Sequence, residues 1–130
     1  MITEDYVSYE TAKLLKEKGF SCDEISCIKV FKGHTYKIHG TVIDADEDVT
    51  IPTIQLAMKW LREVHNIYIN IDIHWLYFAN QNGFMYIITK ILENGTDYVN
   101  SNGDENDEYF YSTYEEACEA AIKYCLENLI

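Results

Sequence analysis

A two-residue alternation of apolar and polar side chains runs through residues 67–78. The apolar positions are Ile67, Ile69, Ile71, Ile73, Trp75 and Tyr77, and the positions between them include Tyr68, Asn70, Asp72 and His74. Successive side chains of a β-strand point to opposite faces, so this pattern predicts a strand with one apolar face. The chain must therefore contain a sheet whose apolar face another element covers.

Three Asn-Gly steps divide the sequence that follows this strand. They are Asn82-Gly83, Asn94-Gly95 and Asn102-Gly103. Both residues readily adopt the positive φ that a two-residue hairpin turn requires. A turn at the first step would place Trp75 opposite Lys90. The sequence thus predicts a four-stranded antiparallel meander, whose last two strands, near 96–100 and 106–111, are short and polar.

Two helices are predicted in the first half of the chain. Ser8 is a good N-cap for a helix over about 9–18, and Gly19 follows its end. Pro52 suits the first turn of a second helix, over about 53–65. One apolar stripe runs along the second helix through Ile54, Ala57, Met58, Leu61 and Val64.

A third helix closes the sequence. It begins at a capping box, formed either by Ser112 with Glu115 or by Thr113 with Glu116. Its apolar face comprises Tyr114, Ala117, Cys118, Ala121, Ile122, Cys125 and Leu129. Between the first two helices, residues 25–32 and 35–43 read as a hairpin that turns at Gly33-His34.

These elements predict a single α+β domain over residues 1–130. An antiparallel sheet, made of a hairpin plus a meander, would carry three helices packed mainly on one face. The predicted core contains Ala57, Leu61, Ile69, Ile71, Ile73, Trp75, Ala117, Ala121 and Ile122. The segment Asp44-Ala45-Asp46-Glu47-Asp48 is predicted to be an acidic loop.

The charge of the chain narrows its possible partners. The formal net charge is −12, of which residues 1–65 carry −3 and residues 66–130 carry −9. Arg62 is the single arginine. A nucleic-acid-binding protein needs a basic face, so we expect no direct binding to nucleic acid or to an anionic membrane. The acidity instead favours a protein partner with a basic surface.

Hydropathy and the first residues predict a cytoplasmic protein. No apolar stretch approaches the roughly 18–20 residues of a membrane span. The first five residues are acidic at Glu4 and Asp5 and lack the basic-then-apolar layout of a secretion signal. Cys118 and Cys125 would lie about 10.5 Å apart along a helix, too far for a disulfide. In a cytoplasmic setting, all four cysteines are expected to be reduced.

The best metal-binding candidates in the sequence are Cys22, Cys27, His34 and His39. Thiolates and imidazoles are the ligands that zinc prefers, although each pair here is separated by four residues rather than by a tight knuckle. The alternative is that they are two small apolar residues and two exposed imidazoles. No metal, cofactor or catalytic residue is therefore assigned, and a metal-dependent or thiol enzyme using this region is the alternative function.

The sequence has more aromatic residues than one sheet face needs, with eleven tyrosines among them. Either helices cover both sheet faces, or some of the aromatic side chains contact a partner, as tyrosine often does. The candidate interaction residues combine aromatic rings and carboxylates: they are Tyr98, Asp104, Glu105, Asp107, Glu108 and Tyr109.

Charges along the last meander strands disfavour self-association through that edge. We therefore expect a monomer or a weak homodimer, with any contact away from residues 97–108. The opposite edge, expected to be the 35–43 hairpin with Lys37, has fewer acidic residues. A structural homodimer through an exposed edge or the aromatic face is a further alternative.

Four segments, 6–8, 12–20, 52–67 and 114–130, resemble small proteins encoded by Bacteroides-type gut bacteria and by their phages or mobile elements. The resemblance covers about a third of the chain and implies no activity, cofactor or site residue. Together with the acidity and the aromatic surplus, it suggests a non-enzymatic interaction protein, acting as an accessory or modulator protein of a phage or mobile element.

Overall fold

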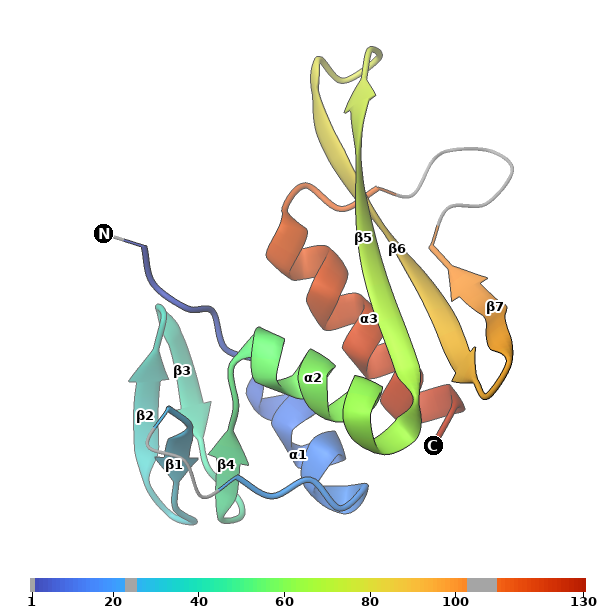
Figure 1. The fold of residues 1–130 in the computed structure, drawn as a ribbon. Helices are drawn as coiled ribbons and strands as arrows, with labels where there is room; N and C mark the ends of the chain where they lie inside the picture. The colour runs from blue at the N-terminus through green and yellow to red at the C-terminus, as the bar shows by residue number, and fades with distance from the viewer. Residues whose placement is uncertain (1, 23–25, 103–109) are drawn as a thin grey trace.

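The computed structural model describes residues 2–22, 26–102 and 110–130, and it confirms the α+β class (Figure 1). Three helices and seven strands follow in this order: α1 (Tyr9–Glu17), β1 (Ile28–Val30), β2 (Thr35–Ile38), β3 (Thr41–Asp44), β4 (Val49–Ile51), α2 (Ile54–His65), β5 (Ile67–Leu76), β6 (Gln81–Leu92), β7 (Gly95–Ser101) and α3 (Tyr114–Asn128). None of the described helices is both long enough and apolar enough to cross a membrane.

Strands β1 to β4 form one long, interrupted hairpin. β1 pairs with β4, and β2 pairs with β3, in a common antiparallel register. The turn lies at His39-Gly40, where both residues have positive φ. The predicted hairpin, which turned at Gly33-His34, is therefore wrong. A left-handed histidine before a glycine provides the same turn geometry that Asn-Gly usually supplies.

Strands β5, β6 and β7 form a three-stranded sheet, in that order and all antiparallel. β5 and β6 are joined by residues 77–80, so Trp75 pairs with Asn82 rather than with Lys90. The predicted turn at Asn82-Gly83 is wrong because Gly83 lies within β6. A Cβ atom at Gly83 would stand 2.6 Å from Leu76 Cδ1 and 2.7 Å from Phe110 Cβ. Glycine is needed there for close packing rather than for a turn.

The meander has three strands rather than four in the part of the chain that the structure describes. β7 confirms the strand predicted near 96–100. Most of the strand predicted near 106–111 lies outside the described residues. Its end does pair with the sheet, because Tyr111 and Phe84 exchange two backbone hydrogen bonds of 2.8 Å. This contact places Tyr111 beside β6 and not beside β7.

The helix ends follow the sequence signals closely. Ser8 caps α1, accepting a hydrogen bond from the Thr11 amide. Thr113 caps α3 in the same way, accepting a hydrogen bond from the Glu116 amide. Of the two predicted N-caps, Ser112 and Thr113, the structure therefore uses Thr113. For α2 the cap is Thr53, so Pro52 lies just before the helix rather than in its first turn.

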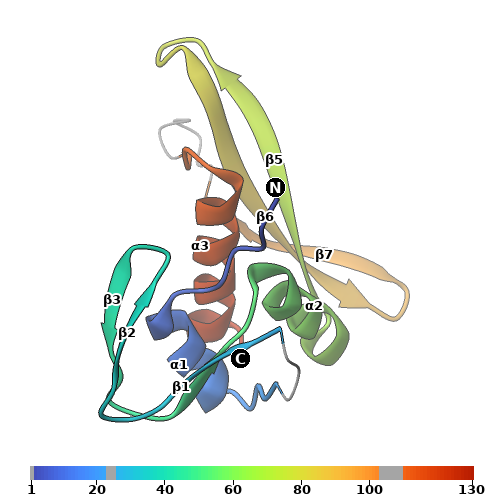
Figure 2. The same cartoon turned by 90° about the vertical axis from the view of Figure 1, so that its left-hand side faces the viewer.

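The three helices contact the meander and strand β4. α3 packs on β5 and β6, α2 packs on β5 and α3, and α1 lies between α3 and β4 (Figure 2). The buried side chains of α3 are Ala117, Cys118, Ala121, Ile122, Cys125 and Leu126.

The 35–43 hairpin is not the second edge of the meander, as the sequence predicted. It belongs to a separate sheet, and the free edge of the meander opposite β7 is strand β5.

The outer half of the β5–β6 hairpin extends beyond the helices in both views (Figures 1 and 2). Ile67 and Ile69 are buried, but Ile73 is 59% exposed and Trp75 is 48% exposed. The prediction that Ile73 and Trp75 are core residues is wrong. Alternation shows that side chains share one face of a strand, but it does not show how far along the strand other elements cover that face. Val64 is likewise exposed on α2.

A disulfide joins Cys22 to Cys27, whereas Cys118 and Cys125 are free and buried. The expectation that all four cysteines are reduced is thus wrong for the first pair. Spacing along a helix excluded only a bond between Cys118 and Cys125, and it placed no limit on two cysteines outside the helices.

Thiol counting tests this pairing. In denaturant without reductant we expect two thiols per chain to react with a chromogenic thiol reagent, and four after reduction. The cells should be lysed and the chain purified at low pH, which keeps the thiols protonated, so that oxidation during handling does not add to the result. Four reactive thiols before reduction would contradict the bond, and the Cys22→Ser/Cys27→Ser variant, with two in both conditions, is the control.

Candidate functional site: an acidic cleft

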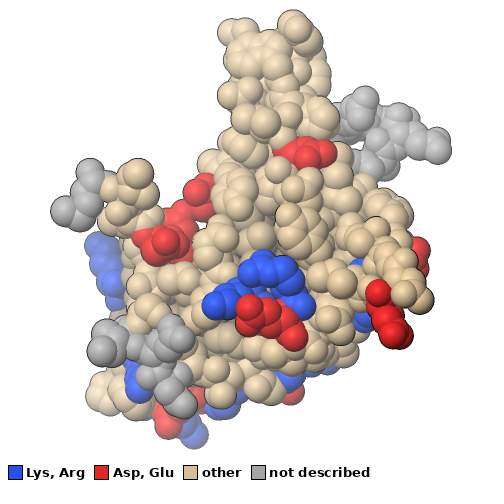
Figure 3. Space-filling model, viewed as in Figure 1, with Lys and Arg blue, Asp and Glu red and all other residues tan. Residues whose placement is uncertain are grey.

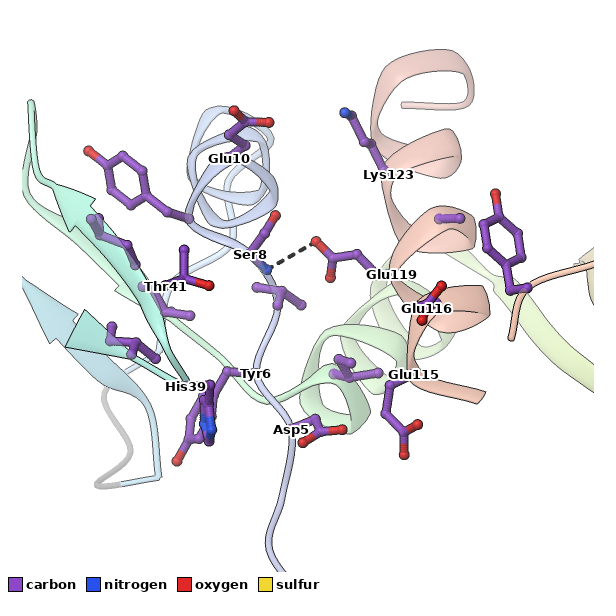
Figure 4. A pocket seen from close by; sticks show the side chains of 18 of the residues that line it. Asp5, Tyr6, Ser8, Glu10, His39, Thr41, Glu115, Glu116, Glu119 and Lys123 are labelled. Atoms are coloured by element: carbon purple, nitrogen blue, oxygen red, sulfur yellow. Dashed lines mark hydrogen bonds between the residues drawn. The ribbon is translucent and has the colours of Figure 1, made fainter. Parts of the chain in front are cut away.

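A cleft of about 820 Å³ lies between the β2–β3 hairpin and α3 (Figure 4). Three segments form most of its lining: residues 5–10 of the N-terminal segment, residues 38–43 of the hairpin, and residues 115–123 of α3. Figure 4 shows the N-terminal segment passing between the other two. The volume falls within the range of roughly 300–1,000 Å³ that is common for ligand pockets.

Backbone hydrogen bonds fix the N-terminal segment in the cleft. Val7 donates its N–H to the Pro52 carbonyl at 3.1 Å, and Ile54 donates to the Asp5 carbonyl at 2.9 Å. The segment is thereby tied to the start of α2 before it enters α1. Asp5 and Glu10 consequently stand on either side of the buried Val7.

Glu119 connects α3 to the start of α1. Its Oε1 accepts a hydrogen bond from the Ser8 N–H at 3.0 Å and another from the Thr11 hydroxyl at 2.6 Å. Because the Thr11 side chain is buried, this carboxylate satisfies a donor that water does not reach. Glu119 therefore holds two walls of the cleft together.

The rim of the cleft is strongly acidic. Among the described residues, five carboxylates and one cation, Lys123, line it: the carboxylates are Asp5, Glu10, Glu115, Glu116 and Glu119. Glu115 and Glu116 lie in the first turn of α3, where the helix dipole favours negative charge. All of these acidic residues except Glu119 are exposed, so they are accessible to a partner.

The inner surface of the cleft is apolar and aromatic. Val7, Ile43, Ile51 and Ile54 are buried beneath it. At one side the rings of Tyr6 and His39 stack, with their centroids 5.7 Å apart (Figure 4). An apolar floor with a carboxylate rim suits a ligand that carries both an apolar group and positive charges.

The four candidate metal ligands are not brought together. Cys22 and Cys27 are bonded to each other, His39 stacks on Tyr6, and the His34 ring lies 6.4 Å from that of Tyr36. Nowhere among the described residues do three His, Cys, Asp or Glu side chains converge as metal ligands would. A disulfide also removes the thiolates that zinc would need.

The two free cysteines are poor nucleophiles. Burial raises the pKa of the Cys118 thiol to about 11 and that of Cys125 to about 12. The reactive species is the thiolate, which is scarce near neutral pH at such pKa values. Both thiols therefore belong to the core packing of α3.

Contacts with α1 account for the acidic segment 44–48. Asp46 accepts hydrogen bonds from the Tyr9 hydroxyl and, at 3.3 Å, from Lys13. These two groups lower the pKa of the Asp46 carboxyl. Lys16 forms an ion pair with Glu47 at 3.6 Å. The acidic residues dock the β3–β4 connection onto α1, and Asp44 continues strand β3.

Tyr98, the candidate interaction residue that the structure describes, does not line the cleft. Tyr98 is 63% exposed on β7, and its hydroxyl donates to Ser101 at 3.2 Å. The other five, from Asp104 to Tyr109, fall outside the described residues. The sequence reasoning missed the cleft itself. Glu115, Glu119 and Lys123 are spaced by four and share a helix face, but nothing local indicates what that face meets.

The chain matches no protein-family model, and no curated protein and no solved structure is significantly similar to it. The cleft and the distribution of charge are therefore the two features of the molecule that bear on its function. Of these two, the cleft is the more specific, since it combines a defined volume with a defined set of charges.

Proposed function

We propose that this chain is a non-enzymatic protein-interaction module whose cleft binds a basic, partly apolar segment of a partner protein. One observation carries the proposal: five carboxylates surround an apolar floor in a cleft of about 820 Å³. A lysine- or arginine-bearing segment with an apolar anchor would satisfy both features.

The charge of the whole molecule supports the same kind of partner. A net charge of −12 attracts basic surfaces over a distance and repels nucleic-acid backbones and anionic lipids. The resemblance to proteins of Bacteroides-type bacteria and their mobile elements suggests an accessory or modulator protein. Such an acidic protein could occupy the basic surface of a host protein.

Binding of a charged peptide to cleft variants tests the proposal. The probe is a fluorescein-labelled heptapeptide of alternating lysine and leucine, followed by anisotropy. We expect saturable binding that weakens as salt screens the rim. The double variant Glu10→Lys/Glu115→Lys should bind about tenfold more weakly, because two rim carboxylates become repulsive.

A matched variant separates the cleft from the overall charge. The double variant Glu63→Lys/Glu93→Lys has the same net charge as Glu10→Lys/Glu115→Lys, but its two exposed positions do not line the cleft. Equal losses in both double variants would show that only net charge matters and would overturn the proposal. A peptide of alternating glutamate and leucine, which should not bind, controls for apolar adhesion.

A further inference from the structure

Strand β5 has a free edge along an uncharged arm. Among the described strands it pairs with β6 on one side and with no strand on the other. We call residues 73–86 of the β5–β6 hairpin the arm. From residue 73 to residue 89 the sequence carries no Asp, Glu, Lys or Arg. In Figure 3 the projecting part of the molecule is correspondingly free of charged side chains above its base.

An exposed strand edge is a template for pairing with another strand. The apolar side chains on this arm include Ile73 and Trp75, together with Tyr77 at 87% and Phe78 at 79% exposure. Within a chain of net charge −12, the arm is a surface where a second copy could approach without bringing like charges together.

The sequence around Ile73 is complementary to itself. In an antiparallel pair of β5 strands with Ile73 opposite Ile73, each Ile71 faces the Trp75 of the other copy. On the opposite face, each Asp72 then faces the His74 of the other copy, where an imidazole N–H can donate to a carboxylate. Isologous pairing of this kind is the commonest arrangement in homodimers.

Two kinds of neighbouring register are less favourable. Centring the pair on Asp72 would set two carboxylates directly opposite each other, which is destabilising. A shift by a single residue in one strand would join the apolar face of one copy to the polar face of the other. The register centred on Ile73 avoids both costs.

We propose that two copies of this chain associate through antiparallel pairing of their β5 edges, centred on Ile73. The two bodies would lie at opposite ends of the paired arms, because β5 runs outward from the helices (Figure 1). The contact is small beside the roughly 800 Å² per partner of a stable interface, so the dimer forms at high concentration. This inference does not depend on the cleft.

Cysteine cross-linking tests the register. Residue 73 lies opposite itself in the proposed dimer, at the roughly 4.5–5.5 Å between Cα atoms that a disulfide accepts. Two copies of residue 75 would be displaced by four residues, about 13 Å along the strand. Under mild oxidation, Ile73→Cys should give at least about tenfold more cross-linked dimer than Trp75→Cys, at two exposed positions on the same strand face.

Sedimentation equilibrium of the unmodified chain provides the second readout. We expect an average mass that rises with concentration, and a loss of that rise in His74→Asp, which places carboxylates opposite each other. The exchanged variant Asp72→His/His74→Asp restores complementarity and should restore the dimer. Equal cross-linking at residues 73 and 75, or a monomer at every concentration, would overturn the proposal. Circular dichroism establishes that each variant is folded.

Discussion

Replacing Ile69 by alanine should lower the free energy of unfolding by about 3 kcal/mol. Ile69 is 7% exposed and pairs across the sheet with Ile88, which is fully buried. Both side chains lie in the part of the sheet that the helices cover. Truncation there removes apolar contacts and leaves a cavity that α3 cannot fill without shifting.

The same substitution four residues further along the same face provides the control. Ile73 is 59% exposed, so Ile73→Ala should cost less than about 1 kcal/mol. Urea unfolding followed by circular dichroism measures both values at a protein concentration low enough to keep the chain monomeric. Equal losses would mean that the arm is packed against the body, contrary to the fold described above.

Replacing Glu119 by alanine should destabilise the protein by about 2 kcal/mol. The change leaves the Thr11 hydroxyl, in a side chain that is 1% exposed, without its charged acceptor, and it also releases the Ser8 amide. Glu119→Gln retains an acceptor oxygen and should recover part of the loss. The contact joins α1 to α3, so its removal should also lower the Tm.

Glu115→Ala is the matched substitution, one helical turn earlier on α3. Glu115 is exposed and makes no hydrogen bond with another described residue, so its loss should cost no more than about 0.5 kcal/mol. Thermal unfolding compares the pair. Indistinguishable melting temperatures for the Glu119 and Glu115 variants would show that the link between α1 and α3 contributes nothing to stability.

The elements that could be predicted are those whose determinants are local. The caps Ser8 and Thr113 and the alternation in β5 each lie within a few residues of the structure they specify. The pairing of β1 with β4 could not be predicted, because the partners are about twenty residues apart and the turn between them uses His39. Gly83 misled the register because glycine serves tight packing as well as turns.

The candidate site was less predictable than the fold. Its acidic character followed from the composition, but its location did not, since the walls come from residues 5–10, 38–43 and 115–123. Glu116 was identified only as part of a capping box; in the structure its amide donates to the Thr113 hydroxyl, and its carboxylate accepts from the Ser112 hydroxyl at 3.3 Å. Which helix face meets which strand is decided by tertiary packing, and a single sequence carries that information only weakly.

The hydrogen bond between Ser8 and Glu119 spans 111 positions of the chain. Such distant contacts form late, because a long loop must close before they contribute. On the ribosome, the hairpin and the N-terminal segment emerge well before α3 does. A nascent chain whose α3 has not yet emerged from the ribosome has two walls of the cleft but lacks Glu115, Glu116 and Glu119. If the cleft binds a partner as we propose, an incomplete translation product that ends before α3 cannot compete for that partner, because it lacks one wall of the site.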